Sequence, residues 1–187
     1  MSKASLTSYI GVSVAIITVC SWVTVPIGPI PITLQMFAIP LIICILPPRC
    51  SIAAVCIFLF LGCLGVPVFS GFRGGIGVLL GPTGGYLLGY IPGTIAGALI
   101  ASYAKRYFPD RKVLLYAFEA AAGLVFTLIA YATGWIQYAN VAGITLEASF
   151  IVSVAPFIVP DIVKVLVAVA CAQPICMVVG NPAVQRR

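Results

Sequence analysis

Apolar residues occur along this chain in long runs, separated by short segments that are polar or rich in glycine and proline. A helix that crosses a bilayer needs about 20 mostly apolar residues. The runs predict six spanning helices, which cover residues 6–25, 35–46, 51–66, 82–103, 113–135 and 160–179. The hydrophobic pattern therefore predicts an all-α membrane protein with six transmembrane helices and short connections.

The composition agrees with the pattern, because 62% of the 187 residues are hydrophobic and only 7% are charged. In a soluble domain about a quarter of the residues are charged. Six spans with their loops use the whole length, so we predict a single integral membrane domain over residues 1–187. The polar start is too short for a signal peptide, and we expect the first apolar run to be retained as a span.

Lysine and arginine fall almost entirely on one side of the predicted membrane. Six spans put both ends of the chain on the same side, and cytoplasmic loops carry an excess of these residues. That side receives Lys3, Arg49, Lys105, Arg106, Arg111, Lys112, Arg186 and Arg187. The other side receives Arg73, while Lys164 lies within the last span. We predict that both termini are cytoplasmic and that the net charge of +6 reflects topology rather than a nucleic acid partner.

Several chemistries find no support in the sequence. There is no histidine, which is the commonest general base and metal ligand. The seven cysteines form no C-x-x-C pair and are expected to be buried free thiols. A G-x-x-x-x-G-K-[ST] phosphate loop is also lacking, so an ATP-driven step would need another subunit. We expect neither an enzyme nor a bound metal or cofactor.

The stretch after the third predicted span holds ten of the eighteen glycines. Half of them recur at every fourth position: Gly81, Gly85, Gly89, Gly93 and Gly97. On a helix this spacing keeps the glycines on one face, and in lipid such a face lets another helix or a ligand approach closely. We predict that most of this ladder, from Gly85 onward, serves helix packing.

The loop before the ladder, residues 72–75, is less easily explained by packing. Arg73 is its one charged residue, and Gly74 and Gly75 follow it directly. A flexible loop of small residues that leads into a spanning helix suits a binding site. We therefore expect these three residues to lie at a site on the outer face.

Prolines at 26, 29 and 31 exclude a regular helix between the first and second spans. Gln35 follows, and its amide can both donate and accept hydrogen bonds. Two interpretations of Gln35 stay open, since it can be a plain helix-start residue or can face a polar ligand. In the first span, Gly11 and Ala15 form a small-xxx-small pair that suits either internal packing or a docking face for another membrane protein.

Asp161 and Lys164 are three residues apart at the start of the last span and so share a helix face. In the middle of a bilayer each would cost about 2.5–3.5 kcal/mol. They can form a mutual ion pair, with Lys164 reaching for the interface, or a polar site that faces the bundle interior. We favour the site, because ionisable residues within spans are functional candidates by default.

Together these motifs resemble a known family. Residues 72–75 and 81–86, followed far downstream by Pro160, Asp161 and Lys164, are similar to the BioY family, the biotin-specific S components of energy-coupling factor (ECF) transporters. The resemblance covers nearly the whole chain. Family members often have a glycine between the proline and the aspartate, whereas Asp161 here follows Pro160 directly.

The resemblance implies an S-component fold and high-affinity capture of biotin at the outer face of a bacterial cell membrane. It also implies partners, namely a transmembrane T component and two cytoplasmic ATPase subunits. The predicted substrate-binding residues are Asp161, Lys164, Arg73, Gly74, Gly75, Gln35 and Tyr86. Asp161 would accept from the ureido N–H groups, Lys164 would donate to the ureido carbonyl, and Arg73 would meet the carboxylate. The opposite assignment, with Lys164 on the carboxylate, stays open.

A stand-alone secondary transporter of a small vitamin-like solute is the alternative. Such proteins usually carry polar residues at several depths, or inverted repeats. Glu119 is the one ionisable residue in the first five predicted spans away from the outer site, and no internal repeat is evident. These features favour the S component and leave the role of Glu119 open.

Overall fold

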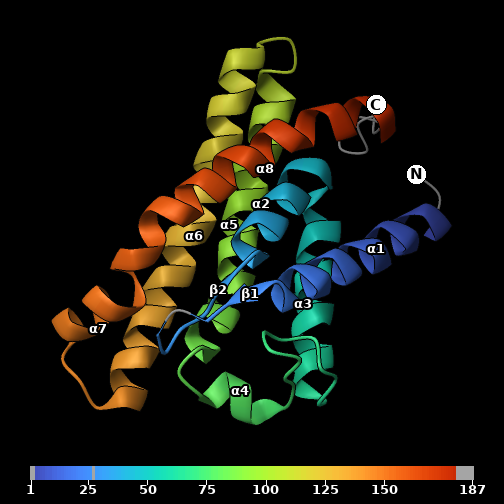
Figure 1. Ribbon diagram of the computed structural model, residues 1–187. Helices are drawn as coiled ribbons and strands as arrows, with labels where there is room; N and C mark the ends of the chain where they lie inside the picture. The colour runs from blue at the N-terminus through green and yellow to red at the C-terminus, as the bar shows by residue number, and fades with distance from the viewer. Residues whose placement is uncertain (1–2, 27, 180–187) are drawn as a thin grey trace.

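A computed structural model describes residues 3–26 and 28–179 of the chain, and these residues are mostly helical (Figure 1). The elements in order are α1 (Lys3–Trp22), β1 (Thr24–Val25), β2 (Ile32–Thr33), α2 (Gln35–Ile45), α3 (Pro48–Cys63), α4 (Ile76–Leu80), α5 (Gly84–Tyr107), α6 (Lys112–Ala142), α7 (Leu146–Ser153), the 3-10 turn η1 (Ala155–Phe157) and α8 (Ile158–Val179). The Lys3 side chain, Arg186 and Arg187, which entered the predicted topology, lie outside the described part.

Four helical stretches of the described chain are long and apolar enough to cross a bilayer. They are α1 from Ser5, α5, α6, and the combined α7, η1 and α8 from Leu146 to Met177. The helices α2 and α3 are apolar but shorter. The chain is thus a multi-pass membrane protein, while six crossings and cytoplasmic termini stay predictions.

The glycine ladder packs α5 against α6, as predicted from Gly85 onward. A Cβ at Gly89 would lie 2.9 Å from the Cα of Ala130, and one at Gly93 would lie 2.9 Å from the ring of Phe126. Only glycine lets the two helices approach so closely. Gly81 ends α4 and does not belong to α5, so the row of glycines on α5 begins at Gly85 rather than at Gly81.

The fifth span, predicted over residues 113–135, is longer in the structure, because α6 continues to Ala142. The apolar pattern persists beyond Trp135, and the helix ends where Gly143 takes a left-handed φ of 65°. Two short features were also missed. β1 and β2 pair as a small antiparallel ribbon in the proline-rich segment. The helix α4 lies within the glycine-rich loop, which joins α3 to α5 over residues 64–83. Both are too short to give a periodic signal.

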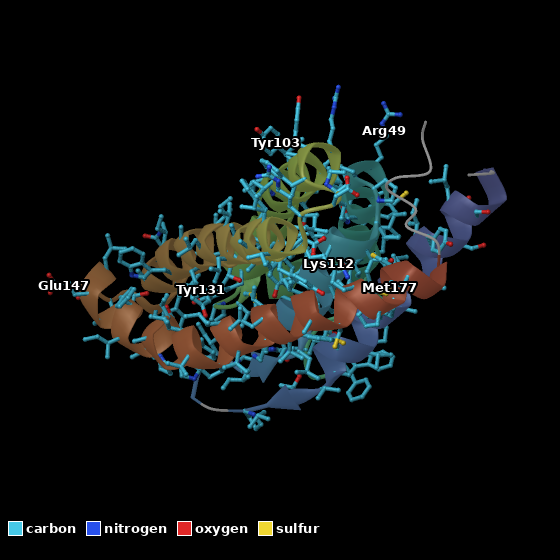
Figure 2. The ribbon with its side chains drawn as sticks, turned by 90° about the horizontal axis from the view of Figure 1, so that it is seen from above. Arg49, Tyr103, Lys112, Tyr131, Glu147 and Met177 are labelled. Atoms are coloured by element: carbon cyan, nitrogen blue, oxygen red, sulfur yellow. The ribbon has the colours of Figure 1, made fainter. Side chains whose placement is uncertain are left out.

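The two ends of the molecule differ in construction. The ribbon β1–β2, α4 and α7 gather at the lower end in Figure 1, and the turn between α5 and α6 lies at the opposite end. Figure 2 shows Glu147, at the start of α7, at one extremity, well separated from Arg49 and Tyr103. The irregular segments therefore share one end of the bundle, as the predicted topology requires of an outer face.

Candidate functional site

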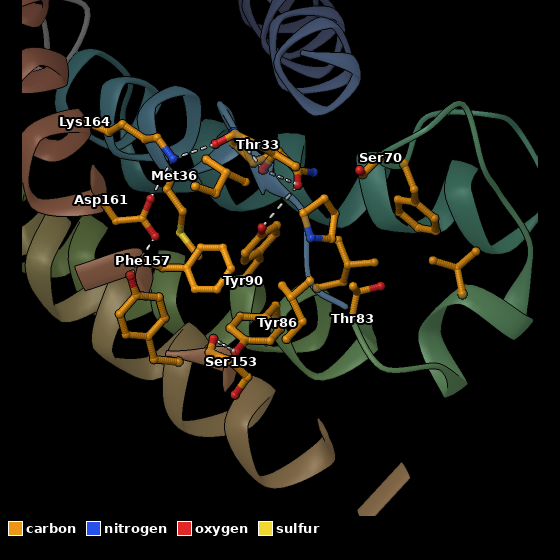
Figure 3. A pocket seen from close by; sticks show the side chains of 18 of the residues that line it. Thr33, Met36, Ser70, Thr83, Tyr86, Tyr90, Ser153, Phe157, Asp161 and Lys164 are labelled. Carbon is orange, nitrogen blue, oxygen red and sulfur yellow. Dashed lines mark hydrogen bonds and ion pairs between the residues drawn. The ribbon is translucent and has the colours of Figure 1, made fainter. Parts of the chain in front are cut away.

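A pocket lies at the irregular end, where β2, the glycine-rich loop and the beginnings of α2, α5 and α8 meet (Figure 3). Five of the seven predicted substrate-binding residues line it: Gln35, Arg73, Tyr86, Asp161 and Lys164. They come from segments more than a hundred residues apart in the sequence. The fold therefore brings the proline-rich, glycine-rich and last-span motifs to one cavity.

Asp161 and Lys164 form the charged corner of the pocket. Lys164 Nζ lies 2.7 Å from Asp161 Oδ1 and also donates to the Thr33 carbonyl at 2.9 Å. Tyr131 of α6 donates to Asp161 Oδ2 at 2.7 Å. Asp161 is only 3% exposed. The mutual ion pair is therefore present, yet a lysine N–H and one lone pair on each carboxylate oxygen remain for a ligand.

Gln35 forms a second polar corner at the first residue of α2. Its Oε1 accepts from Thr33 Oγ1 at 3.2 Å and from the hydroxyl of Tyr90 at 3.3 Å. Gln35 Nε2 is buried and has no hydrogen-bond partner. The side chain is thus held by its oxygen, and its amide N–H groups are unpaired.

Tyrosines of α5 and α6 make the wall between these corners. Tyr86 donates to the Ser153 carbonyl at 2.5 Å and stands edge to face with Tyr131, with ring centroids 6.4 Å apart. A Cβ at Gly134 would overlap the ring of Tyr86, so glycine at this position makes room for it. The wall is rigid, because both ring position and hydroxyl are fixed.

The glycine-rich loop covers the pocket and is attached to the end of α1. Ser21 Oγ donates to the Val68 carbonyl, and Trp22 Nε1 donates to the Pro67 carbonyl at 2.9 Å. The rings of Trp22 and Phe72 stack with centroids 4.9 Å apart. Phe72 has a φ of 56°, in a region that bulky residues rarely enter. The loop thus holds a defined but strained course over the cavity.

The loop residues predicted for the site divide into two kinds. Arg73 lines the pocket but is exposed, and its Nε donates to the Ser70 carbonyl at 3.1 Å. Gly74 and Gly75 are not among the described residues that line the cavity. A Cβ at Gly74 would collide with the backbone at Gly65, and Gly75 has a φ of 95°. These two glycines therefore set the course of the loop.

The cavity measures about 60 Å³. Pockets for drug-sized ligands usually span roughly 300–1,000 Å³. The cavity is therefore small, and a ligand of such size must displace the loop or the lining side chains to enter.

The sequence did not identify Tyr131, Tyr90, Thr33 or Ser153 as site residues. Tyr86 and Tyr90 are four residues apart and share a helix face, which was an available signal. A tyrosine hydroxyl inside an apolar span, as at Tyr131, also needs a partner. Thr33 contributes a backbone carbonyl, which no sequence pattern reveals.

Glu119 lies outside this pocket, in a separate polar cluster. Its Oε2 accepts from Gln173 Nε2 at 2.6 Å, and its Oε1 lies 3.8 Å from Lys105 Nζ. Lys105 also donates to the Cys44 carbonyl. Four helices, α2, α5, α6 and α8, are joined by these contacts, which gives Glu119 a structural role.

A second hollow of about 450 Å³ lies between α6 and the α7–α8 segment. Its lining is apolar apart from two hydroxyls and one indole N–H, all already bonded. Thr127 donates to the Gly123 carbonyl, Tyr131 to Asp161, and Trp135 Nε1 to the Leu146 carbonyl. This hollow offers no free polar group, so the smaller pocket is the candidate solute site.

A multi-pass helical bundle with a small, polar-edged pocket at one end defines a membrane protein that binds a small solute. A family model described as "BioY family" matches residues 2–181. The chain belongs to the BioY family.

Individual relatives agree with the family model. The chain is 37% identical to a probable biotin transporter BioY of Pyrococcus horikoshii over 171 residues, which cover 91% of this chain and 96% of that one. It is 35% identical to the biotin transporter BioY of Thermotoga maritima, over 87% and 90% of the two chains. A crystal structure of the S-component for biotin from an ECF-type ABC transporter superposes with a TM-score of 0.84, at 25% identity and 94% coverage of both chains.

Proposed function

We propose that this protein is the S component of an ECF-type transporter and captures biotin with high affinity at the outer face of the cell membrane. The observation that carries the proposal is the small pocket with Asp161 and Lys164 at its edge, in a chain whose relatives are named biotin transporters. The family is one of transporters, not of enzymes. Titration calorimetry of biotin into the purified protein tests the proposal, and lack of binding would refute it.

The polar groups of the pocket match those of biotin. Asp161 accepts from the ureido N–H groups, and the unused N–H of Lys164 donates to the ureido carbonyl. Arg73 meets the carboxylate at the open side, since arginine pairs well with carboxylates. Tyr86 supplies wall area for the fused rings, and Gln35 adds a further polar contact. If Lys164 met the carboxylate instead, its substitution would affect biotin more than a biotin amide.

Biotin enters by displacing the glycine-rich loop, because the cavity is too small for it and the loop contributes the exposed Arg73 to the lining. Gly74 and Gly75 serve the site by letting the loop take its course. A disulfide between cysteines placed at Trp22 and Phe72 should slow the binding of biotin to the purified protein. Reduction of the disulfide should restore the binding rate. A native rate in the oxidised form would contradict loop movement.

The proposed partners are a transmembrane T component and two cytoplasmic ATPase subunits. Gly11 and Ala15 of α1 are both exposed, and no atom would lie within 4 Å of a Cβ at Gly11. This open face supports docking rather than internal packing. Replacing both residues with leucine should impair assembly and leave biotin binding intact, because bulk prevents close helix approach. Loss of biotin binding with normal assembly would instead indicate internal packing.

The proposed topology has six crossings, with α2 and α3 as short spans and both termini in the cytoplasm. A cysteine placed at Arg73 in a cysteine-free protein should react with impermeant reagents from outside the cell. Labelling from the cytoplasm alone would overturn the topology and the outer site together.

A further inference from the structure

Gln35 Nε2 is a buried donor without a partner at the edge of the solute pocket. Gln35 is 3% exposed and lines the cavity, and its Nε2 makes no hydrogen bond. A buried donor that stays unpaired costs more than a typical hydrogen bond contributes. Such groups in native proteins call for an explanation, and a ligand is one.

The contacts of Gln35 Oε1 fix which end of the amide is available. Thr33 Oγ1 accepts from the Gln35 backbone N–H at 3.4 Å and donates to Oε1. Tyr90 is only 3% exposed, and its hydroxyl donates to the same oxygen. With two donors on Oε1, the amide oxygen is satisfied, and Nε2 is the end left to meet an acceptor.

We propose that Gln35 recognises the ligand as a hydrogen-bond donor, with Nε2 donating to an oxygen acceptor of the bound solute. The inference rests on the proposed function, in which that solute is biotin. Biotin has suitable acceptors in its ureido carbonyl and its carboxylate. A site built to bond a polar group discriminates strongly against ligands that lack it, because the buried partner is then unpaired.

Two substitutions test the direction of this hydrogen bond. Gln35→Met keeps the length of the side chain and removes both donor and acceptor, and we expect biotin affinity to fall about tenfold. Gln35→Glu keeps the oxygen that Thr33 and Tyr90 hold but turns the free end into an acceptor. It should weaken biotin about a hundredfold, because two acceptors then face each other. The order of affinity should be parent, then Met, then Glu.

The measurement is titration calorimetry of biotin with each detergent-purified protein, with a melting curve of each ligand-free protein as the folding control. If Gln35→Glu binds as well as the parent while Gln35→Met is weakened, the amide faces the ligand with its oxygen and the proposal is wrong. If Gln35→Met binds like the parent, Gln35 has a structural role and the proposal is wrong whether or not the Glu variant folds. Absence of biotin binding by the parent would refute the proposed function itself.

Two biotin analogues identify the acceptor. If the acceptor is the ureido carbonyl, the affinity of 2-iminobiotin relative to that of biotin should rise in Gln35→Glu. The guanidinium of 2-iminobiotin replaces the urea, so the new carboxylate then faces a cation. If it is the carboxylate, biotin amide should lose less affinity than biotin in that variant. Either result supports Gln35 as a donor, and equal losses for all three ligands would overturn a direct contact.

Discussion

Two charged pairs lie largely within the described part of the protein, one at each end of the bundle, and they differ in what surrounds them. The pair at the irregular end, Asp161 and Lys164, lies on one helix with 2.7 Å between Nζ and Oδ1. The other pair, Lys105 and Glu119, joins α5 to α6 at 3.8 Å. No side chain of the four is more than 14% exposed, so burial alone does not separate the pairs.

The cavity separates the two pairs. Asp161 and Lys164 line the solute pocket, and Lys164 keeps an unused N–H. Lys105 donates to the Cys44 carbonyl, and Glu119 accepts from Gln173. Neither Lys105 nor Glu119 lines the solute pocket. Charged residues within spans thus include a structural kind, whose partners are all protein groups, and a functional kind, which faces a space that a ligand can fill.

Lys105→Met should have the largest effect and should fall on stability alone. Removing one member of a buried pair typically costs about 3–5 kcal/mol, because the other charge is left uncompensated. We expect a much lower melting temperature and biotin affinity within about twofold of the parent, by titration calorimetry. Adding Glu119→Leu should recover much of the loss. A stable Lys105→Met protein that no longer binds biotin would abolish the distinction between the pairs.

Asp161→Asn should have the opposite profile. The change keeps the shape of the side chain but places a donor where the ligand also donates. A hydrogen bond to a charged group contributes about 1.5–3 kcal/mol, so biotin affinity should fall roughly tenfold to a hundredfold or more. The comparison is titration of Asp161→Asn and Lys164→Ala, each with a melting curve of the ligand-free protein. Parent-like affinity in both would make this pair a structural ion pair too.

Tyr131→Phe should act through Asp161, since the phenol holds Oδ2 at 2.7 Å. We expect an affinity loss of about tenfold, at the lower end for a bond to a charged partner. Because both changes affect one contact, Tyr131→Phe should add little to Asp161→Asn in a double-mutant cycle. Fully additive losses would show that Tyr131 acts independently of the carboxylate.

Arg73→Ala should have the smallest effect, because Arg73 is exposed and solvent screens its charge. Exposed ion pairs contribute about 0.2–1 kcal/mol, so biotin affinity should fall at most about fivefold. Biotin amide should bind Arg73→Ala as it binds the parent. Equal losses for both ligands would mean that Arg73 acts on the loop through its bond to the Ser70 carbonyl.

The sequence predicted the long, regular features of the fold correctly. The four long apolar stretches, the proline-rich break before α2 and the packing of Gly85 onward were all foreseeable, because each depends on local helix geometry or on the reach of a bilayer. Short irregular features were not. The ribbon β1–β2 and the helix α4 are held by contacts between distant segments, and a sequence window does not contain those contacts.

The sequence by itself determined that this is a membrane protein and that Asp161 and Lys164 are candidate site residues, because charge in an apolar run is costly wherever it lies. Tertiary structure decided which charged residues line the cavity. Glu119 looked like an unexplained acid until Lys105 and Gln173 were found against it, whereas Gln35, left open between two interpretations, gained an unpaired donor at a cavity. The reason is physical: the cost of a buried polar group depends on its partners, and only the folded chain supplies them.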